Sequence, residues 1–153
     1  MTGVQTCALP ISEETAAGKK TNVTAYTKPD GKRLSELMGE VNARYSIGLE
    51  QRTAERPRPG DDDGSFVLAG YPAAVINIGS FPYGDPNYHA EGDIPESCDI
   101  ENAAMTVQAT LAAVVTIDQE LRATCRLIRH GISLGNHPTS PRDCREAVCW
   151  KDP

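Results

Sequence analysis

Residues 22–27 read Asn-Val-Thr-Ala-Tyr-Thr, and this stretch decides the fold class of the chain. Polar and apolar side chains alternate along it and several are β-branched, which is typical of a strand. Lys28-Pro29-Asp30-Gly31 follows as a turn, and Asp30 is a good candidate to cap a helix. The chain therefore passes from strand to helix within a few residues, as in the first half of an α/β unit.

The residues that follow continue the order strand, helix, strand, helix. We expect a helix at about residues 32–46, a continuously apolar strand at 73–78 that is buried on both faces, and a second helix capped by Asp99. This order predicts α/β layers around a mostly parallel sheet. The apolar face of the first helix comprises Leu34, Leu37, Met38, Val41 and Tyr45, and that of the second comprises Ile100, Ala104, Val107, Leu111, Val114 and Val115.

Two polar segments separate these elements. Residues 53–64 predict a loop, followed by a single helical turn at 65–69 that Asp63 caps and Gly70 stops. Residues 79–98 predict a long loop with three prolines. A loop of that length inside a compact domain is usually functional.

Composition excludes several classes of protein. The chain has 153 residues, enough for about one domain. No apolar run approaches the roughly 18 residues of a membrane span, so we expect none. A net charge of −6 disfavours nucleic-acid binding, which needs a basic face. Five cysteines, an odd number, imply no complete disulfide framework.

The two ends of the chain differ from its body. Residues 2–11, Thr-Gly-Val-Gln-Thr-Cys-Ala-Leu-Pro-Ile, are the translation of a common sequencing-adapter oligonucleotide. We therefore expect residues 1–12 to be an artefact of metagenomic assembly, and the body, 13–121, to be a fragment whose natural sequence extends upstream. Residues 122–153 carry six Lys or Arg and three Asp or Glu, against an acidic body. This change of composition predicts an atypical tail that is frame-shifted or disordered.

One histidine of the body lies in the long loop. His89 could ligate zinc as a neutral imidazole, and Tyr88 could donate a hydrogen bond to a developing oxyanion. Glu91 and Asp93 are candidates to orient the histidine. We expect the loop beyond the carboxyl ends of the strands, where α/β proteins place their sites. On spacing alone, a solvated surface loop is the simpler interpretation, because one histidine makes no metal site.

A resemblance adds to this pattern. The residues Asp62-Asp63-Gly64-Ser65-Phe66-Val67-Leu68-Ala69-Gly70-Tyr71-Pro72-Ala73, followed by Tyr88-His89, Glu91-Gly92-Asp93-Ile94-Pro95 and Asp99, resemble the C-terminal end of the family-twenty-eight zinc metallopeptidases. That family includes the bacterial leucyl-type aminopeptidases. The similarity covers roughly residues 20–120 in order and spacing. It implies the incomplete C-terminal part of a three-layer zinc-exopeptidase sandwich, with helices flanking the sheet.

The resemblance also implies roles for single residues. His89 matches the last zinc ligand of the family, and Tyr88 matches the tyrosine that helps to polarise the scissile carbonyl or to stabilise the tetrahedral intermediate. Asp62 and Phe66 match the start of the short helix, and Asp93 matches the acid after the ligand. Three positions depart from the family pattern without removing a ligand: Asp61, Asp63 and Ile94 stand where serine, histidine and threonine are usual.

The implied activity is zinc-dependent hydrolysis of N-terminal peptide bonds by a metal-activated water, in a secreted or periplasmic aminopeptidase. The complete protein would bind two zinc ions and a peptide substrate. The other ligands and the catalytic glutamate would lie upstream. We therefore expect this chain alone to be inactive and to bind no zinc tightly.

Other interpretations remain open. The complete protein could be a non-catalytic binding or receptor-type domain of the same fold, or the chain could be a truncated, aggregation-prone product. A separate zinc module in the tail would need a standard ligand spacing, which is missing. Its candidate ligands are Cys125, His130, His137, Cys144 and Cys149. The acidic run 61–63 lacks the spacing of a calcium loop.

Overall fold

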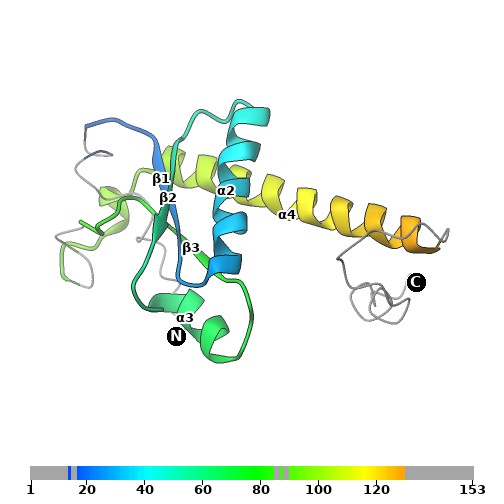
Figure 1. Ribbon diagram of the computed structural model, residues 1–153. Coiled ribbons are helices and arrows are strands. Elements are labelled where there is room, and N and C mark those ends of the chain that lie inside the picture. Colours follow the sequence, from blue (N-terminus) through cyan, green and yellow to red (C-terminus); the bar gives the residue numbers. More distant parts are fainter. Residues whose placement is uncertain (1–13, 15–16, 85–86, 88–89, 130–153) are drawn as a thin grey trace, which may run out of the picture. The chain divides into compact units, whose positions relative to one another are not determined.

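The computed structural model describes residues 14, 17–84, 87 and 90–129, with the side chains of the helix described as far as residue 123 (Figure 1). The chain divides into two compact units, residues 1–113 and 114–153. The first contains a small mixed sheet and most of the helices. Its elements, with the long helix that continues into the second unit, are β1 Thr21–Tyr26, α2 Pro29–Arg44, β2 Glu50–Glu55, α3 Asp61–Leu68, β3 Val75–Ile78, a 3₁₀ turn Pro95–Ser97 and α4 Ile100–Arg129.

The described sheet has the strand order β2-β1-β3 and is mixed. β1 and β2 are parallel, in register from Thr21↔Glu50 to Tyr26↔Glu55. β1 and β3 are antiparallel, so the prediction of a mostly parallel sheet is corrected. α2 crosses back along the sheet and makes β2 parallel to β1. The eight-residue α3 stays at the end where β2 stops, and β3 therefore returns in the opposite direction.

β2 occupies residues where the sequence predicts no strand. Its sequence Glu-Gln-Arg-Thr-Ala-Glu has no apolar alternation, and most of its side chains are exposed. β2 lies at one edge of the sheet, where charged residues are tolerated. Pairing with β1, which local composition does not reveal, makes this segment a strand. β3 also differs from the prediction, because only Ile78 of its four residues is fully buried.

α2 begins earlier than predicted. Lys28 occupies the N-cap position, so Asp30 is not the cap and lies in the first turn. Pro29 at the first helical position and Asp30 beside the helix N-terminus both favour this start. The expected apolar face is confirmed at its centre by the buried side chains of Leu37, Met38 and Val41.

α3 is longer than the single turn predicted. It begins at Asp61 after Gly60, so Asp63 is inside the first turn and is not the N-cap. The predicted stop at Gly70 is confirmed, with a φ of 91° that favours glycine. The amide of Gly70 donates to Val67 O (3.1 Å) and that of Tyr71 to Phe66 O (3.1 Å), which is a Schellman ending.

The two faces of the sheet differ in polarity. The apolar face carries a cluster of Val23, Ala25 and Ile78, against which Ala54 and Ile76 pack at the two edges. The opposite face is polar and meets two helices. Ser35 of α2 donates to Thr24 O (2.6 Å), and Asn77 Nδ2 of β3 donates to Thr110 Oγ1 of α4 (3.1 Å). The residues that share this polar face are Asn22, Thr24, Gln51, Thr53 and Asn77.

The start of α4 confirms the predicted cap, but the packing of the helix corrects the predicted buried face. The amide of Asn102 donates to Asp99 Oδ1 (3.0 Å), so Asp99 is the N-cap. The apolar side chains predicted to form the buried face are exposed, Ile100 at 69%, Val107 at 61% and Leu111 at 62%. The buried face is small or polar and comprises Asn102, Thr106, Ala109 and Ala113. Hydrogen bonds to β1 and β3 and the burial of two alanines therefore replace the large apolar contact that was predicted for this part of the helix.

α4 continues past residue 113 into the second unit. There, Val114 and Val115 are exposed as well, and an ion pair joins Arg122 to Asp118 (2.7 Å). The composition change expected at residue 122 falls within this helix. By length and composition alone, Ile100–Ala123 could also cross a membrane, a property that it shares with core helices of soluble proteins.

Candidate functional site

Tyr88 and His89, the central residues of the predicted site, lie outside the described residues. Of their neighbours, Ala90 donates its amide to Asn87 O (2.8 Å). A turn follows, in which Asp93 N donates to Ala90 O (3.1 Å). A Cβ at Gly92 would overlap the Asn87 amide, so a larger residue there would have to displace that side chain. The described part of the loop therefore contains a tight turn at residues 90–93.

The loop begins and ends beside the same end of β1. Thr21 Oγ1 donates to Gly79 O (2.8 Å) where the loop begins, and Lys20 binds Asp99 where it ends. Since β3 is antiparallel to β1, this end is formed by the amino ends of β1 and β2. The expected position beyond the carboxyl ends of parallel strands is therefore corrected.

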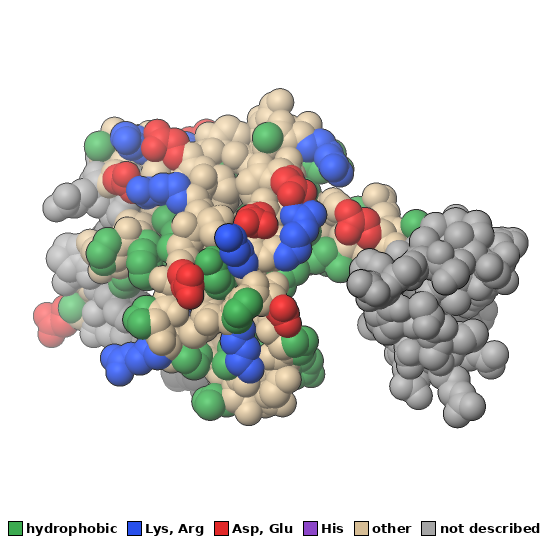
Figure 2. Space-filling model, viewed as in Figure 1, with side chains coloured by type: hydrophobic (Ala, Val, Ile, Leu, Met, Phe, Trp, Pro, Cys, Tyr) green, Lys and Arg blue, Asp and Glu red, His purple; other side chains and the backbone are tan. Residues whose placement is uncertain are grey.

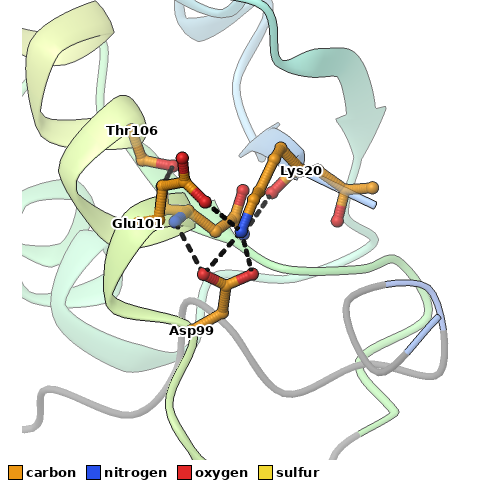
Figure 3. Close-up of polar contacts among 6 residues, drawn as sticks. Lys20, Asp99, Glu101 and Thr106 are labelled. Atoms are coloured by element: carbon orange, nitrogen blue, oxygen red, sulfur yellow. Dashed lines mark hydrogen bonds and ion pairs between the residues drawn. The ribbon is translucent and has the colours of Figure 1, made fainter. Parts of the chain in front are cut away.

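A cluster of charged residues fixes the end of the loop (Figure 3). Lys20 Nζ lies 2.9 and 2.7 Å from the two carboxylate oxygens of Asp99 and 2.8 Å from Glu101 Oε2. The side chains of Lys20 and Asp99 are partly buried, whereas Glu101 is exposed. Lys20 comes from the residue before β1, and both acids come from the start of α4, so the cluster joins two segments distant in sequence.

This arrangement shifts the pKa values of both partners. Hydrogen bonds to Asp99 and Glu101 raise the pKa of Lys20 above its ordinary value, against a smaller opposing effect of burial. Burial alone would raise the pKa of Asp99, but the hydrogen bonds from Lys20 and the Asn102 amide together lower it. Both groups are held in their charged forms. The cluster is suited to anchoring the loop and not to exchanging protons.

Asn102 adds a second connection at this end. Its Nδ2 donates to Thr21 O (2.9 Å), and Thr106 Oγ1 donates to Asn102 O (3.1 Å). Both side chains are buried. This anchor was not predicted from the sequence, although Asn102 and Thr106 stand four residues apart on a helix, a spacing that places them on one face.

The other end of the sheet carries a different charged cluster. Arg56, which follows β2, lies 3.1 Å from Asp63 Oδ1 and 3.0 Å from Asp61 Oδ2. The Asp63 side chain is fully buried, and Thr27 after β1 lies 3.5 Å from its second oxygen. This cluster closes the carboxyl ends of the two parallel strands.

The remaining predicted site residues are divided between the two ends. Asp62 is exposed in the first turn of α3, at the end closed by Arg56. Glu91 is exposed and Asp93 half-buried, both in the loop that starts at the opposite end. Phe66 is 55% exposed and stacks edge-on against Tyr71, with ring centroids 5.7 Å apart. Asp62 and Phe66 thus belong to α3 and its ending, and the loop acids form a separate part of the predicted site.

The described residues include no group of three His, Cys, Asp or Glu side chains that could hold a metal ion. By themselves they do not fit a zinc site. On the face shown in Figure 2, acidic and basic side chains are interleaved and form no basic patch. No protein-family model, no curated protein and no solved structure matches this chain.

Proposed function

We propose that this chain is the C-terminal part of a zinc-dependent exopeptidase, an aminopeptidase, of the three-layer sandwich fold. The observation that carries the proposal is the order and spacing of two segments. Phe66-x-x-Ala69-Gly70-x-Pro72 leads into β3, and Tyr88-His89 followed by Asp93-x-Pro95 leads into α4. The mixed α/β architecture is compatible with the proposal, and the two segments precede and follow β3 along the chain.

Within this proposal, His89 supplies one metal ligand and Tyr88 a hydrogen-bond donor to the oxyanion that forms on the substrate carbonyl. The bound metal would supply an activated water. Asp93 would follow the ligand in a turn closed by its own amide, and the Lys20–Asp99 pair would hold the loop end against β1. The other ligands and the general base would come from residues upstream of this chain.

The proposal is tested by recovering the complete reading frame from the source DNA with long reads across both ends. We expect the frame to continue upstream of Ser12 into a His-x-Asp segment and a Glu-Glu pair. The protein expressed from that frame should release amino-terminal residues from chromogenic aminoacyl substrates. A frame without those upstream residues would overturn the catalytic proposal and favour a non-catalytic binding domain of the same fold.

A further inference from the structure

The two edge strands of the described sheet differ in charge. β2 carries Glu50, Arg52 and Glu55, and the first two of these form ion pairs with Lys19 and Glu14 of the same chain. β3 lies within residues 71–84, a stretch of fourteen residues with no charged side chain. Charged, hydrated side chains protect an edge strand from pairing with another chain, and an uncharged edge lacks this protection.

β3 offers the groups that a further strand needs. Among the residues that the structure describes, β3 pairs only with β1, so half of its backbone N–H and C=O groups point away from the sheet. Ile76 lies on the apolar face and packs on Val23, Ala25 and Ile78, but remains half-buried at the edge. A strand added beside β3 would satisfy these backbone groups and cover Ile76.

We propose that β3 is a self-association edge, along which two copies of this chain pair antiparallel about a two-fold axis perpendicular to the sheet. The axis keeps the apolar face of each sheet on the same side, so the two clusters around Ile76 become continuous. Identical uncharged strands meet without like-charge repulsion. The two three-stranded sheets become one sheet of six strands. Its outer edges are the charged β2 strands, and pairing therefore stops at a dimer.

A strand from a different polypeptide could fit the same edge by backbone pairing alone. The second copy is favoured because the pairing is isologous and places Ile76 opposite, or diagonal to, its counterpart on the same face. This geometry makes a charge at residue 76 meet the same charge in the partner. It also makes opposite charges at residue 76 complementary between two different variants.

The test measures the solution mass of the 153-residue chain by sedimentation across micromolar to submillimolar concentrations. We expect the mass to rise from 16.5 kDa towards twice that value. Ile76→Lys should remain monomeric over this range, and an equimolar mixture of Ile76→Lys and Ile76→Glu should restore the dimer. Ala54→Lys is the matched control, since Ala54 packs on the same cluster from the β2 edge and should leave dimerisation unchanged.

Hydrogen exchange on the unaltered chain gives a second readout if Ile76→Lys does not fold. Amides of β3 should become more protected as concentration rises, while those of β2 should not change. A chain that stays monomeric, or β3 protection that is independent of concentration, overturns the proposal. A dimer dissociated by Val107→Lys but not by Ile76→Lys also overturns it, because the exposed face of α4 would then be the interface.

Discussion

The two ends of the sheet are both closed by ion pairs, but they differ in burial and in what they hold. At the carboxyl ends of β1 and β2, Arg56 pairs with the fully buried Asp63. At the amino ends, the Lys20–Asp99 pair retains some exposure and secures the loop that carries Tyr88 and His89 in the sequence. The end where a parallel sheet would place a site is thus occupied by a structural contact, and the direction of β3 delivers the candidate loop to the other end.

The largest expected effect is at the buried pair. Arg56→Ala leaves the Asp63 carboxylate buried without its cation, and we expect the free energy of unfolding to fall by about 3 kcal/mol or more. Urea denaturation measures this value. Arg58→Ala is the control, because Arg58 is exposed on the same segment and should change stability by less than about 0.5 kcal/mol. Equal effects of the two substitutions would contradict the importance of the buried pair.

A smaller loss is expected at the opposite end. Asp99→Ala removes both the N-cap of α4 and the partner of Lys20, and should cost about 1–2 kcal/mol. Asp99→Asn retains a cap oxygen but loses the charge, so its loss should lie between those of the unaltered chain and Asp99→Ala. If the asparagine and alanine variants were equally destabilised in urea, the cap would contribute nothing.

The pH dependence of stability should distinguish the partners at this end. The pKa of Asp99 is lowered in the folded chain, so its contribution is present above the unfolded pKa of about 4 and is lost as pH falls through the folded value. The pKa of Lys20 is raised, so its contribution is present below about pH 10 and is lost as pH rises through the folded value.

We therefore expect the stability difference between the unaltered chain and Asp99→Asn to be constant near neutrality and to shrink in acid. Denaturation curves at several pH values measure it. A difference that grows as pH falls below 4 would have the wrong sign for a lowered pKa.

The smallest effect is expected at Asp62. Its side chain is exposed beside the buried Asp63, and Asp62→Asn should change the free energy of unfolding by less than about 0.5 kcal/mol. Thermal unfolding of Asp62→Asn and of the neighbouring variant Asp63→Asn measures the two losses of stability for comparison. A loss at Asp62 as large as that at Asp63 would show that the first turn of α3 holds more than one structural carboxylate.

Sequence patterns predicted the elements whose own residues determine them. β1, the apolar face of α2, the Gly70 stop and the Asp99 cap follow from local composition and are confirmed. β2 was missed because its polar sequence becomes a strand only beside β1. The direction of β3 depends on the end of the sheet at which α3 lies, and the periodicity of side chains does not indicate that position.

The orientation of α4 was predicted wrongly for a related reason. Its apolar residues suggested a buried face, but Asn102, Thr106 and Thr110 meet hydrogen-bonding groups within the helix and on the polar face of the sheet. A polar sheet face opposite a helix cannot be recognised from the helix alone. The candidate loop was chosen by its motif. The ion pair that anchors the end of the loop could not be predicted, because Lys20 lies seventy-nine residues away in sequence from Asp99.

The measurement that tests the proposed function most directly is the zinc content of the protein expressed from the complete reading frame. The account predicts that His89→Ala loses one of two bound zinc ions and most aminopeptidase activity while its circular dichroism is unchanged. Arg58→Ala, a substitution of an exposed residue outside the proposed site, should keep both ions. Unchanged zinc content in His89→Ala would contradict the account.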